Sequence, residues 1–315
     1  VTVSAQEFFA ALPHLVFHED EPITWPSSVP LYFVSRLARQ HVTVVLTGEG
    51  ADELFGGYQR YRHYQRDQRL ASAYSYIPSP LRRLLRQGLT QFPGLSPDLR
   101  RKFGHTILGR DLSFESLYLD NYYGAFSPAE INALLPGAAS PYSTFHRYFA
   151  AHPSATLLRR LLYADQKTYL GELLRKQDRM SMATSIESRV PFLDHHFAAL
   201  AAALPDSSKL AASGENKAIL KQAVRGIIPD EIINRPKMGF PTPIQGWLSG
   251  PYRRPVEALL QDPQGFCAQT LSPAAISALL ARTSREDTTD RVWRLLTLEL
   301  WGRHFFLNRP AEIRA

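Results

Sequence analysis

Three carboxylates and four glycines share one short segment, residues 47–58, that directly follows a run of β-branched residues. The acids are Glu49, Asp52 and Glu53. Glycines let a backbone approach a ligand closely, and carboxylates at the end of a strand can hold a divalent cation or orient a nucleophile. The same acids also suit the first turn of a helix, where negative charge is favoured. The residues alone leave both interpretations open, a ligand site and a helix N-terminus.

The elements around this segment favour the ligand site. Residues 42–46 predict a strand that is buried on both faces of a parallel sheet, since they are apolar and β-branched, with helix before them and glycines after. Apolar periodicity predicts helices over 6–15 and 31–40. In open α/β sheets ligands bind beyond the carboxyl ends of the strands, where residues 47–58 begin.

The remainder of the chain predicts helices and few strands. Many prolines and aromatics in residues 70–150 indicate short, irregularly packed helices. Apolar spacing predicts a long helix or a pair of helices over 156–182, and a final helix over 292–306. The expected organisation is therefore an α/β region that carries the ligand segment in 1–70, an irregular helical region in 71–150 and a helical region in 151–315.

Several strings, in order along the chain, resemble signatures of the asparagine synthase family. They are VLTGEGADELFGGY at 45–58, LRKQDRMSM at 174–182, SIESRVPFLD at 185–194, NKAILK at 216–221 and RPKMGF at 235–240. The shorter strings DEP at 20–22 and LELW at 298–301 fit as well. The resemblance extends over nearly the whole chain. It implies a parallel-sheet, adenine-nucleotide α-hydrolase-like (ATP pyrophosphatase) domain followed by a mostly α-helical remainder.

The resemblance implies an ATP-consuming ligase of asparagine biosynthesis. Members adenylate the side-chain carboxylate of aspartate, release pyrophosphate, and let ammonia from glutamine displace AMP. Charge builds on crowded anionic groups in both steps, so a metal ion and a lysine are expected helpers. The implied cofactors are ATP and Mg2+. The glutamate at position 49, where β-lactam-forming relatives have tyrosine, favours asparagine, although a relative acting on another carboxylate stays open.

The resemblance also assigns roles to residues. Asp52 matches the magnesium-binding acid, and Thr47 with Gly48 matches the backbone that contacts the nucleotide. Glu49 matches the acid beside the acyl adenylate, and Lys237 the loop lysine that stabilises charge at the α-phosphate.

Other charged residues of these strings have competing explanations. Glu187 matches an acid near the amino-acid pocket, but Glu187 and Arg189 could instead pair with Asp194 as buried structural charges. Lys176 and Asp178 are expected to form a solvated or structural pair on their helix.

The family's Ser-Gly-Gly-x-Asp-Ser pyrophosphate loop occurs nowhere in these 315 residues, and no N-terminal nucleophilic cysteine is present. We therefore expect a synthetase domain that lacks its first strands and its glutaminase domain. Such a chain would be a fragment, a split-gene product or a degenerate, non-catalytic copy. By itself we expect it to be inactive unless another polypeptide supplies the missing loop.

Composition bears on which partners and which cellular compartment to expect. The formal net charge is +7, yet the chain has no zinc-ligand spacing and no RNP-like aromatic pattern, so no nucleic-acid partner is expected. It contains no apolar run of about 18 residues and no visible signal peptide, so no membrane partner is expected either. Cys267 is the single cysteine, which excludes an intrachain disulfide and favours a cytoplasmic protein with a buried thiol. A homodimer remains open.

Overall fold

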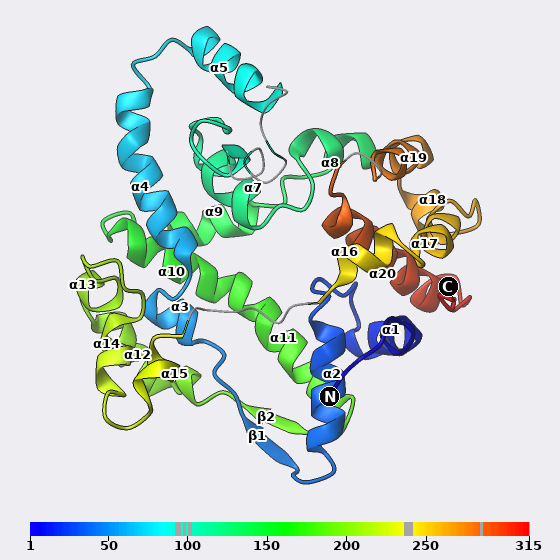
Figure 1. Ribbon diagram of the computed structural model, residues 1–315, viewed down its shortest axis with the longest axis horizontal. Coiled ribbons are helices and arrows are strands. Elements are labelled where there is room, and N and C mark those ends of the chain that lie inside the picture. The colour runs from blue at the N-terminus through cyan, green and yellow to red at the C-terminus, as the bar shows by residue number, and fades with distance from the viewer. Residues whose placement is uncertain (92–95, 97–98, 100–102, 236–241, 284–285, 315) are drawn as a thin grey trace.

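The computed structural model describes residues 1–91, 96, 99, 103–235, 242–283 and 286–314 (Figure 1). In that part of the chain a two-stranded parallel sheet, β1 (Val44–Leu46) and β2 (Glu187–Arg189), is embedded in helices. The helices are α1 (Ala5–Glu19), α2 (Ser28–Ala38), α3 (Ala51–Phe55), α4 (Gln59–Tyr74), α5 (Ser79–Gln91), a π-helix (Glu115–Leu119), α7 (Asp120–Tyr122), α8 (Pro128–Leu134), α9 (Ser143–Ala150), α10 (Leu157–Lys167), α11 (Tyr169–Met182), a 3-10 helix (Pro191–Leu193), α12 (His195–Ala203), α13 (Asp206–Lys209), α14 (Ala218–Ala223), α15 (Asp230–Ile233), α16 (Ile244–Ser249), α17 (Arg253–Leu260), α18 (Phe266–Thr270), α19 (Pro273–Arg282) and α20 (Thr289–Phe305). No described helix is both long and apolar enough to cross a membrane.

Local signals set the ends of several helices. Ser4 accepts a hydrogen bond from the Glu7 amide, and the Glu7 carboxylate accepts one from the Ser4 amide, a capping box that starts α1. Asp20 ends α1 in the left-handed region at φ 62°. The expected helix at 6–15 lies within α1, and the expected helices at 31–40 and 292–306 are confirmed as α2 and α20, which end at Ala38 and Phe305.

The long helical stretch at 156–182 is a pair. Thr156 caps α10 by accepting a hydrogen bond from the Arg159 amide. Thr168 departs from helical geometry, at φ −124° and ψ −74°, and separates α10 from α11. The break lets the two helices point in different directions, so that α11 runs beside the sheet and α10 packs on α9 (Figure 1).

The sheet is parallel as predicted, but it is not buried on both faces. Val44 pairs with Glu187, Val45 with Ser188 and Leu46 with Arg189. Since residues aligned across a sheet share a face, Val44 and Leu46 lie with the two charged residues on one side, where they are 48% and 73% exposed. The opposite side faces α11, whose Gln177 donates a hydrogen bond to Ser188 Oγ at 2.7 Å. The expectation was wrong because the described chain covers only one face.

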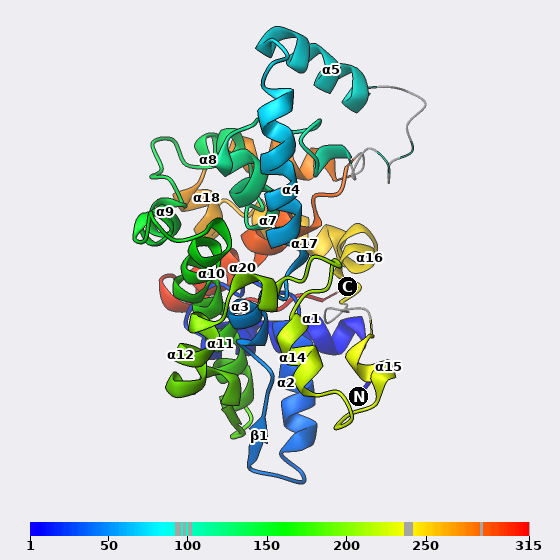
Figure 2. The ribbon, with the colours of Figure 1, turned by 90° about the vertical axis from the view of Figure 1, so that its left-hand side faces the viewer.

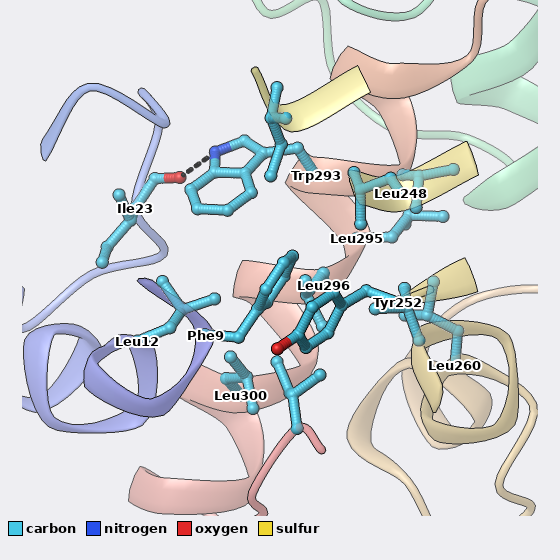
Figure 3. Packing of buried hydrophobic residues seen from close by; sticks show 14 of the residues in the cluster. Phe9, Leu12, Ile23, Leu248, Tyr252, Leu260, Trp293, Leu295, Leu296 and Leu300 are labelled. Carbon is cyan, nitrogen blue, oxygen red and sulfur yellow. Dashed lines mark hydrogen bonds between the residues drawn. The ribbon is translucent and has the colours of Figure 1, made fainter. Parts of the chain in front are cut away.

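The largest apolar core surrounds Trp293 of α20, whose ring is fully buried. α1, α2 and the C-terminal helices α16–α20 contribute to it (Figure 3). The indole of Trp293 donates a hydrogen bond to the carbonyl of Ile23 at 3.0 Å, and Tyr252 stacks on Phe9 at 4.0 Å between ring centroids. Cys267 is buried in this core, as expected from its sequence.

A second, aromatic core joins α4 with the π-helix, α9 and α10. Beyond it, α4 continues outward and carries α5, which stands away from the remaining helices in both views (Figures 1 and 2). The segment between α3 and α4 links this aromatic core to the end of β1, where the candidate site lies.

Candidate functional site

The loop after β1 is held against β2 and open on one side. The amide of Thr47 donates a hydrogen bond to the carbonyl of Arg189 at 2.8 Å, which extends the pairing of the strands. A Cβ placed on Gly48 would meet no heavy atom within 4 Å, so space for a ligand lies beside this backbone. Gly50 has φ 90°, and a Cβ there would come within 2.3 Å of the Leu193 side chain. Glycine at 50 therefore permits both the turn and the packing of the 185–194 string against it.

Asp52 meets a lysine from the 216–221 string. Its Oδ1 lies 2.8 Å from Nζ of Lys217, and both side chains are partly exposed, at 20% and 27%. Gly57 makes this contact possible, since a Cβ there would lie 1.6 Å from Asp52 Oδ1 and 2.8 Å from Lys217 Cε. The 45–58 and 216–221 strings thus meet at Asp52. Lys217 was not among the predicted site residues, and its signal was its position in the NKAILK string.

A polar clamp positions Lys217. The side-chain amide of Asn216 donates to the carbonyl of Gly57 at 3.1 Å, and its oxygen accepts from Arg62 Nε at 2.5 Å. Arg62 also donates to the carbonyl of Glu215 at 2.6 Å. Lys217 itself has φ 53°, a left-handed conformation that is costly for a lysine and that this clamp maintains.

The third acid of the segment, Glu53, turns away from the open side of the loop. It is 1% exposed and accepts a hydrogen bond from the Tyr58 hydroxyl at 2.5 Å. Burial raises the pKa of Glu53, against the lowering effect of Tyr58. The Gln166 side chain donates to the carbonyl of Glu53 at 3.0 Å. Glu53 is therefore an anchor of the loop, whereas Asp52 faces the site.

A buried ion pair supports this anchor. Arg60 Nη2 lies 2.8 Å from Oδ2 of Asp165, with side chains 8% and 0% exposed. The hydroxyls of Tyr61 and Tyr123 also donate to Asp165. The Arg60 guanidinium lies 4.0 Å from the centroid of the Tyr58 ring. Tyr58 therefore contacts both the buried ion pair, through its ring, and Glu53, through its hydroxyl.

Lys176 of α11 comes under the electrostatic influence of Glu49. Both side chains are partly buried. Burial lowers the pKa of Lys176, and the negative charges of Glu49 and Glu19 oppose that shift. Asp178, the expected partner of Lys176, is exposed. Lys176 is a second functional candidate beyond the predicted set.

Glu187 lies apart from the loop. Its amide pairs with the carbonyl of Thr43, at the end of the sheet opposite Thr47. Its carboxylate forms an ion pair with Arg189, and both residues are exposed. Asp194 instead caps α12, accepting from the amides of His196 and Phe197 at 3.0 and 3.1 Å. The alternative of a buried Glu187–Arg189–Asp194 cluster was thus wrong. Lys237 lies outside the described residues.

The two shorter strings have structural contacts. Asp20 and Glu21 form ion pairs with Arg179 and Arg175 of α11, and the carbonyl of Asp20 accepts from the Trp301 indole at 2.9 Å. Glu299, fully buried, accepts from the Cys267 amide at 2.6 Å and from Arg303 at 2.5 Å.

The loop has the donors that a nucleotide and its metal ion need. Thr47 Oγ1 is buried and has no hydrogen-bond partner among the described residues. No group of three or more metal-ligating side chains gathers in the described ranges. Mg2+ at nucleotide sites is held by one or two carboxylates and by substrate phosphates, so the partly exposed carboxylate of Asp52, in the same loop as Gly48, fits that ion.

Comparisons with known proteins agree with these strings. The family model described as Asparagine synthase matches residues 1–303. A predicted glutamine-hydrolysing asparagine synthetase of Mycobacterium bovis is 38% identical over 307 residues, covering 95% of this chain and 45% of that protein. The glutamine-hydrolysing asparagine synthetase 1 of Bacillus subtilis is 31% identical over 312 residues, 95% of this chain and 46% of that protein. The amidase chry2 of Gibberella zeae is 24% identical over 304 residues, 81% of this chain and 42% of that protein. The chain spans less than half the length of these relatives.

Proposed function

Because this chain belongs to the asparagine synthase family, we propose that it forms part of an ATP-dependent, glutamine-hydrolysing asparagine synthetase. The aspartate side-chain carboxylate attacks the α-phosphorus of ATP, which forms an aspartyl adenylate and releases pyrophosphate. Ammonia derived from glutamine then attacks the acyl carbon and displaces AMP. The domain that houses the site is proposed to have the adenine-nucleotide α-hydrolase-like fold.

The observation that carries this proposal is the buried, unpartnered Thr47 Oγ1 beside the open backbone of Gly48. A buried hydroxyl without a partner costs about 1–3 kcal/mol, so a site that retains one is suited to a ligand that satisfies it. Thr47 and Gly48 are proposed to bind the ATP phosphates through this hydroxyl and through the adjoining backbone.

Asp52 is proposed as the protein ligand of Mg2+. A bound Mg2+ neutralises charge on the leaving pyrophosphate. Lys217 Nζ, now 2.8 Å from Asp52 Oδ1, orients the carboxylate, and it can move to a phosphate oxygen on its flexible stem. The Asp52–Lys217 pair is thus a positioned charge pair in the free protein.

The remaining roles follow the chemistry of the two steps. Glu49 is proposed to orient ammonia and accept its proton after the adenylate forms, and Lys176 is the lysine that its charge acts on. Lys237 is proposed to stabilise charge at the α-phosphate while the adenylate forms. Glu187 and Arg189, paired on the exposed face of β2, are proposed to bind the ammonium and carboxylate of the amino acid.

The test separates the two catalytic roles in the complete protein under saturating ammonia. Glu49→Gln is expected to lower the asparagine formed per pyrophosphate released, since the adenylate would form and then hydrolyse. Lys237→Met is expected to suppress pyrophosphate release itself. Lys221→Met, whose lysine pairs with Glu215 at 3.3 Å, serves as the control and should change neither quantity.

Parental product ratios in Glu49→Gln, or normal pyrophosphate release in Lys237→Met, would remove the corresponding role. A complete protein that releases no pyrophosphate with aspartate, or with any other carboxylate, would instead be a non-catalytic binding module. Since the pyrophosphate-loop string is missing from these 315 residues, we propose that this chain alone releases none.

A further inference from the structure

The positive charge of the chain is concentrated in one segment. Residues 68–110 contain eight of the 36 arginines and lysines but only one of the 29 acids, Asp98. Their net charge is therefore +7, and the rest of the chain is balanced, with 28 basic and 28 acidic residues. Such asymmetry within one chain indicates a segment that meets an anionic surface.

Within this segment α5 exposes its apolar side. Leu81, Leu84 and Leu85 follow the three- and four-residue spacing of one helix face and are 50%, 67% and 43% exposed. Tyr76, just before the helix, is 90% exposed. Figures 1 and 2 show α5 at the outer end of α4, away from both apolar cores.

The polar side of α5 is turned toward the protein. Arg86 Nη2 donates to the carbonyl of Arg110 at 3.0 Å and to Asp111 Oδ1 at 2.7 Å. The Arg82 guanidinium lies 5.9 Å from the centroid of the Tyr74 ring. This orientation is the reverse of an ordinary surface helix, which turns its apolar stripe inward. The two arginines thus hold the helix with its leucines outward, where an exposed apolar patch marks an interaction site.

The positive charge of residues 68–110 and the exposed leucines of α5 together indicate the kind of partner. Two copies that met through these leucines would bring two segments of charge +7 together, which repel each other. Single-stranded nucleic acid is bound by aromatic stacking platforms, and the exposed stripe of α5 is aliphatic. An anionic bilayer accepts leucines at its acyl boundary and attracts arginines to its phosphates.

We propose that α5 lies in the interface of an anionic lipid bilayer, with Leu81, Leu84 and Leu85 inserted and Arg83 at the headgroup phosphates. Such a helix spans nothing, so the lack of a membrane-crossing helix among the described ones is compatible with it. This binding is independent of the proposed ligase activity.

The test is co-sedimentation of the full chain with phosphatidylglycerol vesicles and, separately, with phosphatidylcholine vesicles. The chain should bind the anionic vesicles, more weakly as salt increases, and not the zwitterionic ones. Leu84→Glu should weaken this binding at least about tenfold. Leu200→Glu changes a leucine on α12 that is 60% exposed, and it should bind like the parent. Thermal melting of both variants should match the parent, since neither leucine is buried.

Several results would overturn the proposal. They are equal binding to the two kinds of vesicle, no binding to phosphatidylglycerol, and unchanged binding of Leu84→Glu. A parent that is dimeric by light scattering, binds no vesicle, and becomes monomeric in Leu84→Glu would identify a second copy as the occupant. Stronger binding to random RNA than to phosphatidylglycerol, insensitive to Leu84→Glu, would identify a nucleic-acid surface instead.

Discussion

Replacing Asp165 by asparagine tests whether the buried ion pair holds the aromatic core and, through it, the loop of the candidate site. The substitution keeps the side-chain shape but removes the charge that faces Arg60. Asp165 is 0% exposed and Arg60 8%, so the guanidinium would remain buried without its counter-ion. Removing one partner of a buried pair costs about 3–5 kcal/mol.

The surroundings place the expected cost at the lower end of that range. The Arg60 guanidinium also lies 4.0 Å from the Tyr58 ring centroid and 4.5 Å from that of Tyr169, and these rings keep part of its stabilisation. Asparagine can still accept a hydrogen bond from the Tyr61 hydroxyl. We therefore expect Asp165→Asn to lower the free energy of unfolding by about 3 kcal/mol.

Urea unfolding of the full chain, followed by circular dichroism, measures this change. The matched control is Asp111→Asn, which removes the same charge from an arginine-paired aspartate whose side chain is 72% exposed. That control should cost less than about 1 kcal/mol. Adding Arg60→Met to Asp165→Asn should recover much of the loss, because no charge is then left unpaired. A loss below about 1 kcal/mol for Asp165→Asn, or no recovery in the double variant, would refute the reasoning.

Three further predictions follow from single contacts. Gly57→Ala places a Cβ 1.6 Å from Asp52 Oδ1, so magnesium-dependent pyrophosphate release by the complete protein should fall at least about tenfold. Gly171→Ala adds a Cβ that meets nothing within 4 Å and should leave that release unchanged. If Gly57→Ala released pyrophosphate as fast as Gly171→Ala, the close approach of Gly57 to Asp52 would have no role in activity. Burial raises the pKa of Glu19 from 4.5 to about 7, so the folded state favours its neutral form. The neutral carboxyl therefore contributes stability that is complete below pH 4.5 and is lost as the pH rises through 7. Glu19→Gln stays neutral at every pH, so at pH 8 it should raise the free energy of unfolding by up to about 3 kcal/mol in urea titrations. An unchanged stability at pH 8 would show that Glu19 ionises freely. Cys267 is fully buried and burial raises its pKa, so iodoacetamide should modify it only on unfolding; rapid labelling of the native chain, read by mass spectrometry, would contradict the packing.

Much of the local structure could be predicted from the sequence. Capping residues, apolar periodicity and β-branched runs act over a few neighbouring residues, so α1, α2, α20 and the strand at β1 were found in their places. The strand-end position of Asp52 and the glycines around it could also be predicted, because they follow directly from the order of residues 42–58.

Which face of each element is covered could not be predicted in the same way. Residues 42–46 have the composition of a doubly buried strand, yet Leu46 is 73% exposed. The composition of a strand indicates which environments it tolerates, whereas its exposure depends on which other segments of the fold pack against it. The outward leucines of α5 are a second case, since they depend on where Arg86 finds Asp111.

The sequence by itself determined that three acids follow a strand and that the strings along the chain resemble signatures of one family. Only the tertiary structure decided that Asp52 faces Lys217 while its neighbour Glu53 turns inward to Tyr58. Adjacent residues of a helix point about 100° apart, so the surroundings turn one acid toward the candidate site and the other toward the core. Those surroundings are formed by residues more than 100 positions away in the chain, such as Asp165 and Lys217, and no local pattern contains them.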